Sequence, residues 1–183
     1  MKNITRIIVL ICAFSYTQSA LAQDPTDDYK KHFKLATGLS AGLPLNDPYD
    51  LNLGADVRLL YSISKSYSLS FTVGYNTLLV KDENLLVKDD AVNFAYVPVK
   101  VGYKTFLFQN EFYVMGEIGG AFSATKDYDK NSMIFSPSVG YASKYADISL
   151  RYEFIKDFPI IKNNEIDNGY AQLMLRVAYT FDL

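Results

Sequence analysis

Apolar side chains alternate with polar or small ones from residue 33 onward, beginning with Phe33, Leu35, Thr37, Leu39, Ala41 and Leu43. A period of two residues is typical of a β-strand whose two faces meet different surroundings. The pattern recurs along the chain and predicts eight strands, at 33–43, 51–63, 67–78, 93–106, 111–123, 133–143, 147–154 and 169–181. No segment has the period of a long amphipathic helix.

The second face of these predicted strands is charged. It carries Asp56, Arg58, Lys100, Lys104, Glu117, Asp147, Arg151, Glu153 and Arg176. Two soluble folds, a lipocalin-like barrel and a β-sandwich, would have to bury these charges in a dry core at high cost. If the apolar face meets lipid instead, the charges line a hydrated or mutually paired interior, and closure of the sheet satisfies the backbone. The polarity therefore predicts an all-β, eight-stranded antiparallel up-and-down transmembrane β-barrel.

The connections between the predicted strands alternate in length. Those at 64–66, 107–110 and 143–146 are short, and those at 44–50, 79–92, 124–131 and 155–168 are longer. Outer-membrane barrels have short periplasmic turns and long external loops, which would place both termini in the periplasm. Outward aromatic residues gather at the predicted periplasmic rim: Phe33, Tyr61, Tyr67, Tyr103, Phe112, Tyr141, Tyr179 and Phe181. The outer rim has fewer candidates: Tyr75, Phe122, Phe135 and Phe154.

Residues 1–22 are typical of a cleaved signal peptide. Lys2 and Arg6 precede a short apolar run at 7–14, and small residues at 20–22 offer a cleavage site. The apolar run is well short of the roughly 20 residues that a membrane-spanning helix needs. We expect residues 23–31 to form a periplasmic tail and residues 32–183 to form the barrel. Cys12 is the single cysteine and lies in this leader, so disulfide and thiol chemistry are not expected of the mature chain.

The amino-acid composition excludes further classes of protein and partner. The chain is 49% apolar and 21% charged, unlike a disordered protein, and a mature length of about 161 residues suits one domain. Acidic residues outnumber basic ones by 20 to 18, which disfavours a nucleic-acid partner.

Two segments resemble known membrane barrels. They are the run from Asn93 to Tyr103 in the fourth predicted strand and the closing alternation Leu173, Leu175, Val177, Tyr179 and Phe181. On these segments the chain resembles the small outer-membrane barrels of the OmpA/OmpX type, and more loosely the outer-membrane β-barrel domain proteins of Bacteroidota. The resemblance implies a place in the bacterial outer membrane, contact with its lipid and lipopolysaccharide, and insertion by the barrel-assembly machinery. Tyr179 and Phe181 would belong to the assembly signal.

Candidate chemistry is sparse, and we predict no catalytic, cofactor-binding or metal-binding residues. His32 is the single histidine and has no neighbouring cysteine or acidic ligands in the sequence, which favours a solvated rim residue. The inward carboxylates could be a paired acid and base for hydrolysis, but charge pairing is the favoured interpretation. Some barrels of this size act on lipid A through His and Ser near the outer leaflet. His32 lies at the opposite end, so a lipid-modifying enzyme is a distant alternative.

The inward charges predict a structural cluster made of Asp56, Arg58, Lys100, Glu117, Arg151, Glu153 and Arg176. A tight turn between Leu107 and Asn110 would place Lys100 directly opposite Glu117. Asp56 and Glu153 would then pair with Arg151 and Arg176, because guanidinium groups in a narrow lumen need acidic partners. The lumen is therefore predicted to be plugged by its own side chains, and a narrow pore for small solutes is the alternative.

The predicted external loops are the remaining candidates for a function. The second loop contains a near-repeat, Leu79 to Glu83 and Leu86 to Asp90, which could extend the flanking strands or be a simple duplication. The four loops together carry a net charge of about −5, which disfavours an anionic partner unless divalent ions bridge it. The sequence thus predicts a structural or surface-interaction protein, whose partner it does not name.

Overall fold

The computed structural model describes residues 31–45, 49–80, 93–107, 111–124, 131–156, 161–162, 165–166 and 169–183. The predicted leader at 1–22, most of the predicted tail and nearly all of the near-repeat in the second loop lie outside these residues. Within the described ranges, no helix has the length and apolar character needed to cross a membrane.

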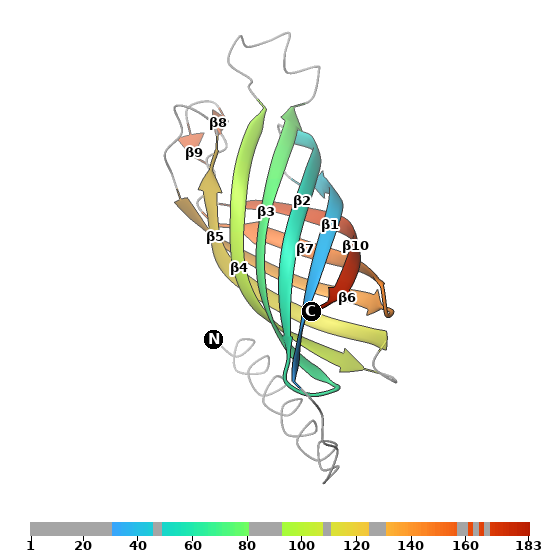
Figure 1. Cartoon of the computed structure of the whole chain (residues 1–183). Helices are drawn as coiled ribbons and strands as arrows, with labels where there is room; N and C mark the ends of the chain where they lie inside the picture. Colours follow the sequence, from blue (N-terminus) through green and yellow to red (C-terminus); the bar gives the residue numbers. More distant parts are fainter. Residues whose placement is uncertain are drawn as a thin grey trace, which may run out of the picture. The chain divides into compact units, whose positions relative to one another are not determined.

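Eight long strands form the barrel wall (Figure 1). They are β1 His32–Pro44, β2 Tyr49–Ser62, β3 Tyr67–Val80, β4 Phe94–Leu107, β5 Phe112–Ser123, β6 Asn131–Ala142, β7 Ala146–Ile155 and β10 Tyr170–Asp182. Each pairs antiparallel with its neighbour along the chain, and β1 closes the sheet by pairing with β10. The predicted up-and-down barrel is confirmed, and the predicted strand limits lie within two residues of these. Closure leaves no unpaired edge in the wall.

A small hairpin was not predicted. β8 Ile161–Lys162 pairs with β9 Glu165–Ile166, inside the segment 155–168 that the sequence assigned to a loop. Each strand is two residues long, too short for the alternation of polar and apolar residues to be visible.

The connections define two different ends of the barrel. Residues 63–66, 108–111 and 143–145 join strands at what we call the short-turn end, where the amide of Ser143 donates to the carbonyl of Ala146 at 2.7 Å. The connections 45–48, 81–93, 124–130 and 156–169 join strands at the other end, which we call the long-loop end. The first has four residues, no more than 63–66 or 108–111, and the other three have 7 to 14 residues. The predicted alternation in length therefore holds for the last three of these connections but is wrong for the first, because β1 and β2 extend further than predicted and shorten the predicted 44–50 connection.

The register between β4 and β5 corrects one prediction. Leu107 pairs with Phe112, so Lys100 lies opposite Gly119, and Glu117 lies opposite Gly102. The prediction that Lys100 lies directly opposite Glu117 is wrong because four residues, not two, separate the last paired positions, although the Lys100 ammonium still lies 3.9 Å from the Glu117 carboxylate. A shift of two residues keeps every side chain on its predicted face, since the side-chain period of a strand is two.

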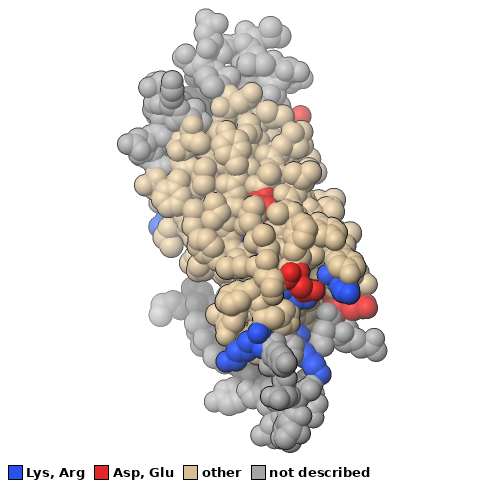
Figure 2. All heavy atoms as spheres, in the orientation of Figure 1, with Lys and Arg blue, Asp and Glu red and all other residues tan. Residues whose placement is uncertain are grey.

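The outward face is a continuous apolar belt. Apart from Asp50, at the register shift that begins β2, none of the outward positions of the eight wall strands is Asp, Glu, Lys or Arg. Large apolar side chains point away from the barrel there, such as Leu39, which is 71% exposed. Figure 2 shows this face almost free of charge along the wall, with charged side chains gathering toward the lower end of the view. Such a surface is costly in water and suited to lipid.

Aromatic rings surround the short-turn end in contacting pairs. The ring centroids of Phe33 and Tyr61 lie 4.9 Å apart, and those of Tyr179 and Phe181 lie 4.7 Å apart. Two further pairs, Tyr67 with Tyr103 and Phe112 with Tyr141, use the remaining aromatic residues predicted for this rim. The rings form a girdle of the kind that lies at a membrane interface. Tyr145, in the β6–β7 turn, stacks on Tyr179 and was not predicted to take part.

Candidate functional site in the barrel interior

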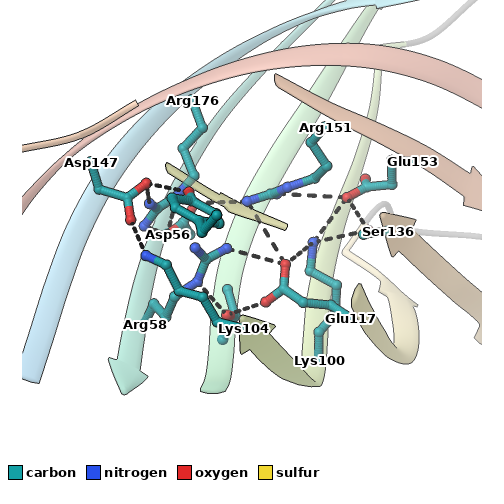
Figure 3. A network of polar contacts seen from close by, with 12 residues as sticks. Asp56, Arg58, Lys100, Lys104, Glu117, Ser136, Asp147, Arg151, Glu153 and Arg176 are labelled. Atoms are coloured by element: carbon teal, nitrogen blue, oxygen red, sulfur yellow. Dashed lines mark hydrogen bonds and ion pairs between the residues drawn. The ribbon is translucent and has the colours of Figure 1, made fainter. Parts of the chain in front are cut away.

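Nine charged side chains fill the middle of the barrel interior, and none is more than 9% exposed. They are Asp56, Arg58, Lys100, Lys104, Glu117, Asp147, Arg151, Glu153 and Arg176. All nine occupy the charged face that the alternation predicted. Figure 3 shows that they point toward one another from strands around the wall, and we call them the charge network.

Glu153 on β7 receives hydrogen bonds from three other strands. The Lys100 ammonium donates to its carboxylate at 2.9 Å and the Ser136 hydroxyl donates at 3.0 Å (Figure 3). The Tyr96 hydroxyl and the Gln172 amide each donate at 2.9 Å to its other oxygen. A carboxylate with this many donors is held in one position, and its charge is balanced by Lys100.

Two Arg–carboxylate pairs lie beside it. The Arg176 guanidinium donates to Asp56 through Nε at 2.8 Å and also through Nη2. The Arg58 guanidinium donates to Glu117 at 3.1 Å, and the Thr72 hydroxyl donates to the same carboxylate at 2.6 Å. Both pairs join residues far apart in the sequence, and such charged contacts fix orientation as well as charge.

Arg151 lies between these groups without a short contact to any of them. Its guanidinium nitrogens are 3.7 Å from Glu153, 3.9 Å from Asp56 and 4.0 Å from Glu117. Its Nε and Nη2 atoms have no hydrogen-bond partner among the described residues. Arg151 therefore joins the network by charge rather than by directed hydrogen bonds.

A third pair lies toward the short-turn end. Lys104 donates to Asp147 at 2.7 Å, and the Tyr113 hydroxyl donates to the same carboxylate at 2.6 Å. The Lys104 ammonium also lies 3.7 Å from the centroid of the Tyr113 ring, a cation–π contact. Arg176 links this pair to the rest of the network, with Nη1 3.7 Å from Asp147.

The interior changes character at the long-loop end. There a buried apolar cluster consists of Tyr49, Leu78, Phe94, Tyr96, Ala121, Ile134, Ile155 and Tyr170. We call it the apolar cap. Its members come from every wall strand except β1, and the Tyr49 and Tyr170 rings meet edge to face at 6.1 Å. Tyr96 belongs to the cap and, through its hydroxyl, to the charge network.

Glycine makes room for these side chains. A Cβ atom added to Gly38 would lie 2.8–2.9 Å from the Arg176 guanidinium, and one added to Gly102 would lie 2.6 Å from the carbonyl of Gly116. The lumen is too narrow for side chains at these positions, as expected for an eight-stranded barrel.

Comparison with known proteins identifies the architecture. No protein-family model and no curated sequence matches the chain. Its structure is similar to that of Ail from Yersinia pestis in complex with the heparin analogue sucrose octasulfate, at 13% identity and a TM-score of 0.54, covering 84% of this chain and all of that one. It is also similar to the N-terminal barrel of Pseudomonas aeruginosa OprF, at 10% identity and a TM-score of 0.51, covering 83% of this chain and all of that one. A designed transmembrane β-barrel matches at 12% identity and a TM-score of 0.50, covering 85% of this chain and all of that one.

The chain has the fold of a small outer-membrane β-barrel. This confirms the resemblance to barrels of the OmpA/OmpX type at the level of fold. The looser resemblance to Bacteroidota proteins stays a prediction.

In this outer-membrane fold, the predicted site residues lie in two places. The seven residues of the predicted cluster all belong to the charge network, and Tyr179 and Phe181 lie on the outward rim of β10. Asp56 pairs with Arg176 as expected, whereas the nearest cation to Glu153 is Lys100 and not Arg151. His32 begins β1 at the short-turn end, apart from these contacts.

Sequence reasoning missed the polar partners and the cap. Thr72, Tyr96, Ser136 and Gln172 all face inward by the same alternation, and a search for every inward polar residue would have found them. The cap had a weaker signal: inward positions become apolar near the long-loop ends of the strands, as at Leu78, Ile134 and Ile155.

Proposed function

We propose that this chain is an integral protein of the bacterial outer membrane with a structural or surface-interaction role. The wall anchors the protein, the lumen is closed, and the long loops face outside while both termini lie in the periplasm. The observation that carries the proposal is the filled interior, where charged side chains are paired with one another and the long-loop end is covered by the apolar cap.

Two successive layers of side chains support the proposal of a closed lumen. A solute passing through would have to separate ion pairs such as Lys100 with Glu153 and Arg58 with Glu117. It would then have to cross the cap, where Leu78, Ile155 and Tyr170 are fully buried. Separating buried ions without a replacement partner is strongly unfavourable, so a continuous water path is disfavoured.

Enzymatic activity is not part of the proposal. Each of the four buried carboxylates has a cation within ion-pair distance: Asp56 with Arg176, Glu117 with Arg58, Asp147 with Lys104 and Glu153 with Lys100. A general acid or base needs access to a substrate proton, and these groups are engaged inside the wall.

The loops are the proposed contact surface. Sucrose octasulfate, the ligand in the Ail complex, is a polyanion, whereas the loops here carry a predicted charge of about −5. We therefore favour a neutral or cationic surface partner. The wall would contact outer-membrane lipid and lipopolysaccharide, and the barrel-assembly machinery would read the end of β10 at Tyr179 and Phe181.

Conductance of the purified full chain in a planar bilayer tests the closed lumen. We expect no steady current for the wild type and a measurable current for Glu117→Ala combined with Tyr170→Ala, because the two changes remove the partner of Arg58 and open space in both the network and the cap. Leu53→Ala, on the lipid-facing side of β2, is the matched control and should stay closed. A steady, porin-sized conductance that the combined Glu117→Ala and Tyr170→Ala changes leave unaltered would overturn the plugged lumen.

Cell fractionation tests the location separately. We expect the chain in the outer-membrane fraction, with a migration on gels that changes on heating, as folded barrels show. Recovery in the soluble periplasmic fraction would overturn the outer-membrane assignment.

A further inference from the structure

The outward belt contains a groove of about 670 Å³ that crosses strands β4 to β7 and reaches β10. Its floor is formed by Gly116 of β5 and Pro137 of β6, which are paired in register. Tyr103 of β4, the partner of Gly116 on the other side, forms one wall. Tyr152 of β7 and Leu173 of β10, which also pair with each other, form the opposite wall.

Two residues make this part of the wall hollow. Gly116 has no side chain, and a Cβ atom added there would meet nothing within 4 Å. Pro137 has a short ring and no amide hydrogen, and the pairing of β6 with β7 is interrupted between Phe135 and Ser138. The flanking rings stand above this floor, with Tyr103 46% and Tyr152 39% exposed.

The outward residues of the lining form two adjacent rows across the strands. The groove extends from Gly116 and Pro137 through the next outward row, Val114 with Val139, toward the short-turn end. The row after that contains the contacting aromatic pair Phe112 and Tyr141, which lies beyond the lining. Most of the lining therefore lies in the short-turn half of the belt, on β4, β5 and β6, while Tyr152 and Leu173 lie in the long-loop halves of β7 and β10.

We propose that this groove holds one acyl chain of a phospholipid from the periplasmic leaflet. The inference rests on the proposed function, because it takes the belt to face lipid and the short-turn end to face the periplasm. If nothing fills the groove, its floor and two walls lack dispersion contacts, and their apolar side chains offer water no hydrogen bonds. A flexible acyl chain fills it and touches a floor and two walls, whereas a chain elsewhere on the belt touches one surface.

A second copy of the protein fits this groove less well. The belt is convex, so another barrel would meet the rings of Tyr103 and Tyr152 before it reached Gly116. A narrow, flexible occupant follows the floor, and acyl chains are the molecules of that shape present around the belt.

Native mass spectrometry of the full chain tests the proposal. The protein is reconstituted into vesicles of phosphatidylethanolamine and phosphatidylglycerol, floated with them on a density gradient, and released into mild detergent. We expect the wild type to retain one phospholipid and Gly116→Leu to lose it, because the new side chain occupies the floor. Gly116 has a backbone conformation open to any residue, so this variant should fold.

Two further variants make the result specific. Ala55→Leu adds a large apolar side chain at an outward position of β2, away from the groove, and should retain the lipid. Tyr152→Ala removes a wall and should lower the retained fraction at least severalfold.

The possible outcomes distinguish a failure of the acyl-chain proposal from a failure of the proposed function. Wild-type protein that floats with the vesicles but retains no phospholipid, or retains it equally in Gly116→Leu, overturns the acyl-chain site alone. A dimer that Gly116→Leu abolishes would assign the groove to a second copy and overturn it too. A chain that does not float overturns both proposals.

Discussion

The middle of the lumen and its long-loop end lie on the same inward face of the same strands, yet they are filled by opposite chemistry. The middle holds nine charged side chains joined by ion pairs, and the long-loop end holds the apolar cap. Tyr96 joins the two, since its ring packs in the cap and its hydroxyl donates to Glu153. One barrel thus fills its interior in two physically different ways.

The difference predicts how each region responds to substitution. Removing one member of a buried ion pair leaves an uncompensated charge, so the free energy of unfolding should fall in a large step. Removing a methyl group from an apolar cluster loses contacts in proportion to the volume removed. The charge network should therefore be intolerant of single changes, and the cap should respond gradually.

The largest effect is expected at Glu153. Glu153→Ala leaves Lys100 without its nearest anion and three further donors without their acceptor, and should lower the free energy of unfolding by about 3–5 kcal/mol. Urea unfolding of the refolded protein in lipid vesicles measures this. Glu153→Gln keeps the size and some hydrogen bonds and should cost less. A loss below about 1 kcal/mol for Glu153→Ala would show that the network does not carry stability.

The lipid-facing side provides a reference outside both regions. Leu175→Arg or Val99→Arg places a charge in the apolar belt and should cost about 2–4 kcal/mol near the bilayer midplane. The same unfolding assay applies, with Asn84→Arg in the predicted second loop as the control. Equal losses at all three positions would contradict the assignment of the outward face.

A smaller, graded loss is expected in the cap. Ile155→Val removes one methyl group from a fully buried position and should cost about 0.5–1.5 kcal/mol. Ile148→Val is the matched control, because Ile148 lies on the same strand but points outward and is 46% exposed. If the two variants lose the same stability, the cap is not a packed core.

The smallest effect on stability is expected at the end of β10. Phe181→Ala removes an exposed ring of the aromatic girdle, and we expect it to slow assembly more than it lowers final stability. Insertion is followed as the appearance of the heat-modifiable form in the presence of purified barrel-assembly machinery. An unchanged insertion rate would remove Phe181 from the assembly signal.

The sequence by itself determined the number of wall strands, their limits and the face of each side chain. These features are local, because the two-residue period assigns alternate residues to opposite faces whatever the neighbouring strand is. Inward Asp56, Glu117 and Arg176 could therefore be recognised before any contact was known. The predicted face of each side chain in β4 and β5 is correct although the predicted register is wrong, since a shift of two residues changes the paired residues and not their faces.

Only the tertiary structure decided which inward residues meet. Lys100 pairs with Glu153, 53 positions away, and Asp56 with Arg176, 120 positions away. These contacts depend on the length of each turn and on which strands face each other across the narrow lumen of the closed wall. The alternation of residues within a single strand carries no information on either. The apolar cap and the groove over Gly116 have the same origin. Each is made by neighbouring strands together, so its shape exists only once their registers are set.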